Sequence, residues 1–565
     1  MSRLWRWVIP CLVTLIALFV VFDQPMLFTG NVAYGFGPDA PGTIWMYDWV
    51  KEDVLSGKFP THTTRMYYPE GIDLLLRNGS NVVDALLSVP FQLFFPTPLA
   101  LVLTTTLIVL GNGLCIQPLL RHVAPNSAAV RWCVGAWWMI NPYVIDEIAR
   151  GRPTQAMLWF VPFAILGALR LRDWRDAAML GVAVGLQALT YWYMALFLAI
   201  ALIPLGIEKL FVARAKAALL FAMAVLLAAL VVAPLAVPIA RAAFQREIPG
   251  LDLPIERSLI YVTAALRFEH LWLLHGNPLT VAILAVGLVS LRKNAWAVAG
   301  ILLAGAFGLG VRIPLSHGAL ESVPYAWLYH HSAFIARLNF PERIYSVVYA
   351  LLAVILAGVL DRARSAWVGF AVWGFALAWP FARGALPLPL RTTAPFPASV
   401  IIAGTPGPVL VTPTESTDNA LIQQSYFKSP LVSGMGDHEA TVRTEAFNRL
   451  FRENAFFNAI MLQTAVPSWA TLDVNKLGKT VRWVWYDRQV QERLLGEPVS
   501  NAQLERLKSY MGTPYYADEL TALWDIRRPG RSATKAEKTI AMTAHKVYIP
   551  YSRVADATQN SWKNY

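Results

Sequence analysis

Long apolar runs separated by short polar breaks extend over the first two thirds of the chain. Most of them approach the ~20 residues that an α-helix needs to cross a bilayer. A shorter apolar segment at 82–95 ends before Pro96 and predicts a re-entrant or interfacial segment. The pattern predicts a polytopic α-helical membrane protein with about eleven transmembrane helices. We expect these helices at 5–22, 97–119, 127–145, 154–171, 175–190, 192–208, 216–240, 278–291, 294–311, 342–360 and 365–381.

Basic residues gather in alternate loops between these runs, so that they all fall on one side of the membrane. The positive-inside rule makes that side the cytoplasm. We therefore expect an inner (cytoplasmic) membrane protein with a cytoplasmic N-terminus, and with the loops 23–81, 241–277 and 312–341 outside. The basic residues are Arg3, Arg6, Arg121, Arg131, Arg170, Arg172, Arg175, Lys209, Arg214, Lys216, Arg292, Lys293, Arg362 and Arg364.

Residues 383–565 have a different character and predict an extracytoplasmic α/β domain that follows a transmembrane domain at 1–382. A Pro-rich linker opens this segment, and about thirty polar residues at its end predict a loose tail. Between them, short β-like runs alternate with amphipathic segments. We expect strands at 409–412, 481–486 and 520–526, and helices at 440–463 and 488–508.

Composition agrees with a membrane protein, because 56% of the residues are hydrophobic and only 15% are charged. The net charge of +12 does not indicate nucleic-acid binding, since the basic residues mark the ends of apolar runs. Cys11, Cys115 and Cys133 all lie in apolar runs without CxxC or Cys/His spacing. They therefore indicate neither a disulfide framework nor a zinc site.

The first outside loop, 23–81, crowds carboxylates, aromatic residues and Gly/Pro turns together. Asp39 lies just beyond the first apolar run, and Asp48 and Glu52 follow four residues apart on one helix face. An Asp before a helix is often only an N-cap. With other acids nearby at the membrane surface, we interpret Asp39 as a catalytic carboxylate that takes a proton from a substrate hydroxyl.

Two later outside loops carry charges that suit a phosphate or a cation. Asp146 and Glu147 are adjacent acids whose oxygens could bind a divalent cation, Mg²⁺ or Mn²⁺. Arg150 and Arg152 follow them and could pair with a phosphate. Simple solvation of a loop is the alternative. Two further arginines flank a span on the side opposite to the basic loops, which favours phosphate binding. They are Arg337 and Arg343.

Five short motifs together resemble the GT-C superfamily of polytopic glycosyltransferases, in its bacterial membrane-protein branch. The match covers most of the chain in order. The motifs are Asp39 with Trp45, Tyr68-Pro-Glu70-Gly71, Asn141-Pro-Tyr143 leading to Gln155 and Trp159-Phe-Val-Pro162, Tyr191-Trp-Tyr193, and Pro324-Tyr-Ala-Trp327 running into Arg337-Leu-Asn-Phe-Pro-Glu-Arg343.

The resemblance implies transfer of a sugar from a polyprenyl-phosphate donor to a hydroxyl of a glycan, lipid or protein. It implies that Asp39 activates the acceptor, and that Asp146 and Glu147 are accessory or metal-linked. Many relatives carry an acidic pair in the first loop, whereas this chain has Asp39 alone. We expect the substrate to be contacted by Asp48, Trp45, Tyr68, Glu70 and Gln155.

The alternative is a non-catalytic membrane protein, either a saccharide or lipid transporter or an assembly scaffold. A transporter should carry ionisable groups in the middle of its spans. Here the acids lie almost entirely in loops, which favours the transferase.

Overall fold

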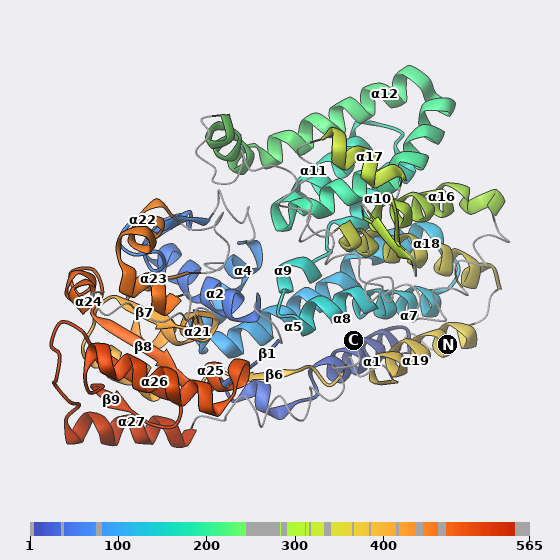
Figure 1. The fold of residues 1–565 in the computed structure, drawn as a ribbon. Coiled ribbons are helices and arrows are strands. Elements are labelled where there is room, and N and C mark those ends of the chain that lie inside the picture. The colour runs from blue at the N-terminus through green and yellow to red at the C-terminus, as the bar shows by residue number, and fades with distance from the viewer. Residues whose placement is uncertain are drawn as a thin grey trace.

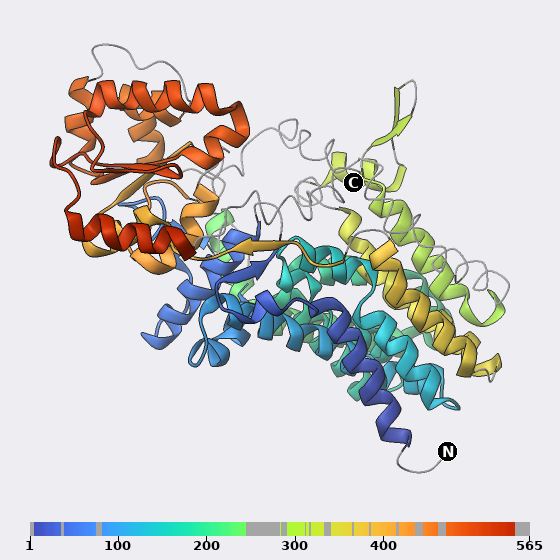
Figure 2. The same ribbon diagram turned by 90° about the horizontal axis from the view of Figure 1, so that it is seen from below.

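A computed structural model of the chain shows a large helical part and a smaller part that contains a sheet (Figures 1 and 2). Arg337 and most of the predicted span 278–291 lie outside the described residues. The structure describes residues 5–35, 39–74, 82–244, 283, 291–310, 312–315, 318–321, 323–332, 341–363, 366–382, 386–413, 417–434, 444–461 and 471–547.

Helices form over the predicted apolar runs that the structure describes, but the runs 127–145 and 154–171 are each divided into two helices. The runs 192–208 and 216–240 merge into one helix, α12, which is broken only by a non-helical backbone at Arg214. The helices of this part are α1 (Trp5–Phe22), α5 (Thr97–Cys115), α6 (Gln117–Val123), α7 (Ala128–Met139), α8 (Pro142–Ala149), α9 (Pro153–Ala156), α10 (Val161–Arg170), α11 (Trp174–Thr190), α12 (Trp192–Phe244), α16 (Leu291–Gly308), α18 (Tyr345–Ala363) and α19 (Ala366–Ala382).

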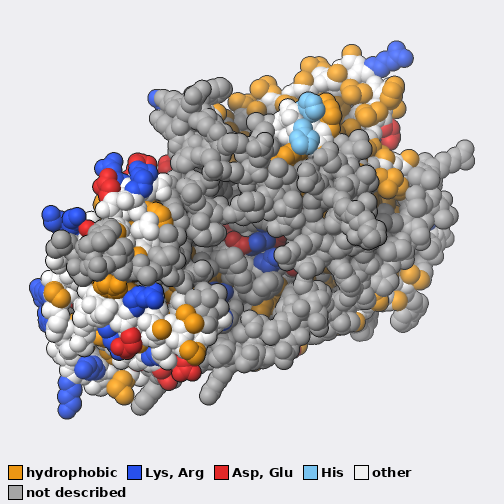
Figure 3. Space-filling view, viewed as in Figure 1, with side chains coloured by type: hydrophobic (Ala, Val, Ile, Leu, Met, Phe, Trp, Pro, Cys, Tyr) orange, Lys and Arg blue, Asp and Glu red, His pale blue; other side chains and the backbone are white. Residues whose placement is uncertain are grey.

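Three stretches of the described residues are both long and apolar enough to cross a membrane, namely Thr97–Val123, Trp192–Arg241 and Pro341–Arg362. They support a helical membrane protein, and the count of about eleven crossings stays a prediction. Pro341–Arg362 is largely buried inside the protein, whereas Trp192–Arg241 is largely exposed. Hydrophobic side chains cover α12 at the upper right of Figure 3. Such a surface suits contact with lipid.

The loop 312–341 is more structured than the sequence suggested. A hairpin joins β4 (Arg312–Leu315) to β5 (Gly318–Glu321). Helix α17 (Val323–His331) follows, and a 3₁₀ turn, η3 (Pro341–Ile344), leads into α18.

The first loop folds into short elements around one longer helix, α2 (Asp39–Leu55). The predicted interfacial segment contains α4 (Val83–Gln92), which packs on α2. A polar side chain recurs every fourth residue along α4, at Asp84, Ser88 and Gln92, and all three are buried. The remaining elements are η1 (Pro25–Phe28), β1 (Val32–Tyr34), β2 (His62–Thr63) and β3 (Ile72–Asp73).

The C-terminal part is built on a mixed four-stranded sheet of order β7-β8-β10-β9 with helices on both sides (Figure 2). The parallel pair is β7 (Val409–Thr412) and β8 (Trp483–Asp487), and β10 (Thr521–Asp525) and β9 (Tyr516–Ala517) continue antiparallel. The helices are α20 (Pro397–Gly404), α21 (Thr417–Phe427), α22 (Glu445–Glu453), α23 (Ala455–Met461), α24 (Thr471–Leu477), α25 (Arg488–Leu495), α26 (Glu497–Met511) and α27 (Lys535–Val547).

Three predictions for this part need correction in detail. The helix predicted at 440–463 is two helices over its described residues, since the extended backbone of Asn454 separates α22 from α23. The helix predicted at 488–508 is two helices, since Gly496 with φ +87 separates α25 from α26. The start of the predicted loose tail is instead α27, which packs on α20 and buries Ala541.

The two parts are joined along the first loop. Strand β1 pairs antiparallel with β6 (Leu390–Thr392), and Gln24 Nε2 donates to the carbonyl of Leu388 at 2.7 Å. Helix α2 packs against α21 of the C-terminal part, beside which it lies in Figure 1. The segment that carries Asp39 is therefore held from both sides.

Candidate active site

Asp39, the first residue of α2, forms an ion pair with Arg152, which lies 113 residues further along the chain. Arg152 Nε donates to Asp39 Oδ2 at 2.6 Å, and Nη2 of the same guanidinium contacts the same oxygen. The Asp39 side chain stays 47% exposed. It is therefore both held in place and open to solvent, and it does not stand alone at the start of a helix.

Helix α8 brings Arg152 into position through its two ends. Asn141 caps the start, accepting from Val144 N at 3.2 Å, and Pro142 takes the first helical position. At the other end Gly151 has φ +76. The N–H of Gly151 donates to the Ile148 carbonyl and that of Arg152 to the Glu147 carbonyl, both at 2.8 Å. This pair of bonds is the Schellman motif, which turns Arg152 back over Glu147.

Glu147 lies between two arginines that come from distant parts of the chain. Its Oε2 is 3.5 Å from Arg152 Nη1, and its Oε1 is 3.8 Å from Arg343 Nε. Only 4% of its side chain is exposed. Burial raises the pKa of Glu147, while the guanidinium groups of Arg343 and Arg152 act in the opposite direction. Glu147 thus links the Asp39–Arg152 pair to Arg343.

Two tyrosines accompany Arg343, which lies in η3 and is buried. Its Nη1 donates to the hydroxyl of Tyr191, and its guanidinium lies 5.4 Å from the centre of that ring. Tyr143 is buried within electrostatic reach of Glu147 and Arg343, and its hydroxyl has no hydrogen-bond partner among the described residues. Both tyrosines belong to motifs that carried the family resemblance, but the sequence assigned them no role.

Backbone segments approach very closely beside Asp39. A Cβ atom on Gly151 would lie 2.7 Å from Ala40 Cα and 3.2 Å from Ala40 N. Thr43 Oγ1, one turn further along α2, donates to the Gly151 carbonyl at 2.7 Å. The start of α2 is therefore seated on the turn that follows α8.

The predicted cation site does not assemble among the described residues. Asp146 is bound by Arg150, whose Nε donates to Oδ2 at 2.9 Å, while Glu147 faces Arg152 and Arg343. In the part of the chain that the structure describes, no three His, Cys, Asp or Glu side chains gather to hold a metal. Asp146 Oδ2 and both oxygens of Glu147 face guanidinium groups here, and a divalent cation at these two acids stays a prediction.

Several residues predicted to contact substrate instead contact the C-terminal part in this structure. Trp45 is buried and its Nε1 donates to Gln424 Oε1. The amide N–H of Tyr68 donates to the Leu431 carbonyl at 3.0 Å. Glu70 Oε2 accepts from the Ala446 N–H at 2.9 Å. Their roles toward a substrate stay predictions.

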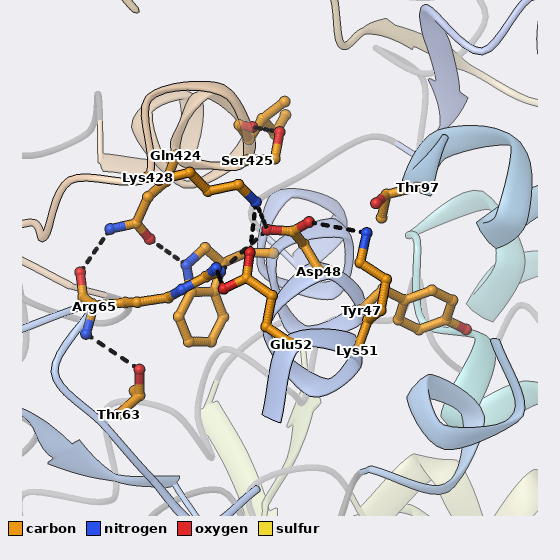
Figure 4. A network of polar contacts seen from close by, with 12 residues as sticks. Tyr47, Asp48, Lys51, Glu52, Thr63, Arg65, Thr97, Gln424, Ser425 and Lys428 are labelled. Carbon is orange, nitrogen blue, oxygen red and sulfur yellow. Dashed lines mark hydrogen bonds and ion pairs between the residues drawn. The ribbon is translucent and has the colours of Figure 1, made fainter. Parts of the chain in front are cut away.

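Asp48 belongs to a cluster of charges between α2 and α21 (Figure 4). Its Oδ2 accepts from Arg65 Nη1 at 3.1 Å and from Lys428 Nζ at 2.7 Å. Lys428 also binds Glu52 at 2.8 Å, and Arg65 reaches the same carboxylate. The structure therefore places Asp48 in the contact between the two parts, separately from the Asp39–Arg152 pair.

Gln155 lies in α9, three residues after Arg152, and its role toward a substrate stays a prediction. Its Oε1 is buried without a hydrogen-bond partner among the described residues. Figure 3 shows acidic and basic side chains together in a hollow in the middle of this face. The described site thus holds two carboxylates, two arginines and a tyrosine, namely Asp39, Glu147, Arg152, Arg343 and Tyr191.

No family model matches the sequence, and no curated protein matches it. Solved structures do. Arabinofuranosyltransferase AftD from Mycobacteria matches with a TM-score of 0.52 at 14% identity, over 86% of this chain and 35% of that one. The oligosaccharyltransferase of Archaeoglobus fulgidus, crystallised with Zn and sulfate, matches with a TM-score of 0.50 at 13% identity, over 91% of this chain and 72% of that one.

These two proteins are GT-C superfamily glycosyltransferases. The resemblance inferred from the sequence is therefore confirmed at the level of the fold. The chain has a GT-C-like fold, and it spans about a third of the length of AftD.

Proposed function

We propose that this chain is a membrane glycosyltransferase that moves a sugar from a polyprenyl-phosphate donor to an acceptor hydroxyl on the extracytoplasmic side. One observation carries the proposal. A solvent-accessible carboxylate, Asp39, lies beside Arg152, and buried Glu147 connects that pair to Arg343. The GT-C-like fold supports the same reaction class.

In the proposed reaction, Asp39 accepts the proton of the acceptor hydroxyl. The hydroxyl oxygen forms a bond to the anomeric carbon, and the bond from that carbon to the phosphate oxygen breaks. Polyprenyl phosphate leaves with the electron pair of that bond. Arginines stabilise the charge that develops on the phosphate, and Arg152 and Arg343 are the described candidates, with Arg150 beside them.

Glu147 orients the arginines in this scheme. Its carboxyl is buried between the guanidinium groups of Arg152 and Arg343 and fixes both. The scheme includes no metal step, because Asp146 and Glu147 are directed at arginines. The acceptor in this proposal is a hydroxyl of a glycan, a lipid or a protein.

The orientation across the membrane belongs to the same proposal. Arg170, Arg172 and Lys209 lie within electrostatic reach of His122 at one end of the helices. Under the positive-inside rule this basic end faces the cytoplasm. The opposite loops, which carry Asp39 and Arg152, would then face outside together with the C-terminal part.

The decisive variant is Asp39→Asn, tested after reconstitution in liposomes with a panel of polyprenyl-phosphate-linked pentoses and hexoses. The amide keeps the shape of the carboxyl but is not a base, so we expect transfer to fall by at least about 100-fold. Release of polyprenyl phosphate and glycosylated product would be measured together. Asp53→Asn is the matched control, because it makes the same change near the other end of α2.

We expect the control to retain wild-type transfer and both variants to fold as the parent does. Full activity in Asp39→Asn would remove Asp39 from the chemistry. If the wild-type chain transfers none of the sugars, yet polyprenyl phosphate raises its unfolding temperature, the scaffold or transporter alternative would replace the transferase.

A further inference from the structure

Asp84 is a buried acid that the proposed chemistry does not use. It lies in the first turn of α4, and its residue is only 3% exposed. No Lys, Arg or His forms an ion pair with it in the part of the chain that the structure describes. Burying a carboxyl without a cation is costly unless hydrogen bonds compensate for lost water. Its neighbours should therefore explain why it is there.

Both oxygens of Asp84 accept a hydrogen bond, each from a different element. Oδ2 accepts from the Tyr47 hydroxyl at 3.0 Å, and Tyr47 belongs to α2. Oδ1 accepts from the Thr154 hydroxyl, and Thr154 belongs to α9. Asp84 thus joins three helices at one buried point.

The same face of α4 makes a second contact with α2. Gln92 Nε2 donates to the Tyr47 carbonyl at 3.0 Å and to Ser88 Oγ at 2.6 Å. Residues 84, 88 and 92 are four apart, so they share one side of the helix. This polar face holds Tyr47 by its side chain and its backbone together.

The two helices that Asp84 joins both carry the proposed active site. Asp39 lies eight residues before Tyr47 on α2, a rise of about 12 Å. Arg152 lies two residues before Thr154, at the N-cap position of α9. We propose that Asp84 is a positioning residue, whose hydrogen bonds to Tyr47 and Thr154 fix α2 and α9 so that Asp39 and Arg152 meet. The inference rests on the proposed function.

A carboxylate suits this task for a simple chemical reason. The two hydroxyls lie on different elements, and a carboxylate accepts at both oxygens. An amide would present an N–H group to one of the hydroxyls and force it to turn. A hydrocarbon would leave both hydroxyls buried without their bonds.

The sharpest test acts on Thr154, because valine removes its hydroxyl with almost no change in shape. In Thr154→Val we expect kcat to fall about tenfold or more, since small displacements of catalytic groups are costly. The KM for the lipid-linked sugar should stay within about twofold, because Arg343 lies in η3, which the Asp84 contact does not hold. Thr154→Ser restores the hydroxyl and should restore kcat. Asp84→Asn should lower kcat in the same way.

A merely structural role predicts another pattern, in which kcat falls only in proportion to the folded fraction and kcat per folded molecule stays at the wild-type value. That pattern, or a wild-type kcat in Thr154→Val, would overturn the proposal. Amide hydrogen exchange provides a readout independent of transfer. Exchange at 39–45 and 150–157 should rise in Thr154→Val relative to Thr154→Ser.

The two readouts separate the failure of this inference from the failure of the proposed function. If the wild-type chain transfers no sugar, the transferase proposal fails, while the exchange comparison still judges Asp84. Equal exchange in the valine and serine variants would then show that the Asp84 contact does not fix the two segments.

Discussion

Gly151 is the residue at which the two halves of the proposed site touch through their backbones. Its φ of +76 is readily accessible only to glycine, and its missing side chain leaves room for Ala40. A methyl group there would meet Ala40 Cα at 2.7 Å. Ala40 follows Asp39 directly, so the contact would displace the carboxylate itself.

We expect Gly151→Ala to abolish most transfer activity while the protein still folds. Gly57→Ala is a matched control, because Gly57 has φ +73 but nothing within 4 Å of an added Cβ. Both variants incur a similar backbone cost of about 1 kcal/mol, and only Gly151→Ala pushes on α2. Transfer rates and unfolding temperatures of the pair provide the measurement. Equal loss of activity in both would contradict the proposed contact.

At the scale of elements, the buried N-cap residue of α25 makes the stability of that helix depend on pH. Asp487 ends β8 and caps α25, with Oδ1 accepting from Val490 N at 3.1 Å and Oδ2 accepting from Asn419 Nδ2 at 3.1 Å. Burial raises the pKa of Asp487 to about 6, while the hydrogen bond from Asn419 acts in the opposite direction. The folded state therefore binds a proton more tightly than the unfolded chain does. This group lowers stability as pH rises from about 4 to about 6.

Asp487→Asn should remove this pH dependence while keeping a good N-cap, since asparagine caps helices as well as aspartate. Above pH 6 we expect the variant to be more stable locally than the parent, by up to about 3 kcal/mol. Near pH 4 the two should be alike, because both side chains are then neutral. Opening free energies of α25 amides, from hydrogen exchange at several pH values, would measure the difference. A difference that is the same at every pH would rule out titration of Asp487.

The elements that the sequence predicted well are those with local signals. The run at 409–412 is β7, whereas the span predicted at 127–145 is divided into α7 and α8 by the N-cap Asn141 and Pro142. The contact of Glu147 with Arg343 spans 196 residues, and no local pattern indicates it. The sequence carries a partial signal for Asp84. Polar residues at every fourth position of an apolar segment predict a helix with one buried polar face.

At the scale of the whole molecule, the first loop and the C-terminal part form one continuous contact. Backbone hydrogen bonds connect them. Tyr68 N donates to the Leu431 carbonyl at 3.0 Å, and Leu431 N donates to the Arg65 carbonyl at 2.8 Å. Gln424 is fully buried here and donates to the Arg65 carbonyl at 2.7 Å. The charges of Figure 4 line the same contact. The C-terminal part therefore packs against α2 and stabilises its position.

Gly434 tests whether this contact holds the two parts together. A Cβ atom there would meet the buried ring of Tyr67, 2.8 Å from Cδ2 and 3.0 Å from Cζ. The ring is packed edge-on against Phe447, with centroids 5.7 Å apart, and has little room to move. We expect Gly434→Val to weaken the contact by about 1–3 kcal/mol. Hydrogen exchange should then rise by roughly tenfold or more at 65–73 and 417–434, and should stay unchanged in α18.

Gly404→Val is the control for this experiment, because nothing lies within 4 Å of a Cβ on Gly404, at the end of α20. It should leave exchange at both segments as in the parent. If the two variants behave alike, the contact at Tyr67 does not stabilise the interface between the first loop and the C-terminal part. If Gly434→Val also raises exchange at the start of α2, the C-terminal part supports the helix that carries Asp39. If the amides at 39–45 instead stay protected, the C-terminal part stabilises only the C-terminal end of α2.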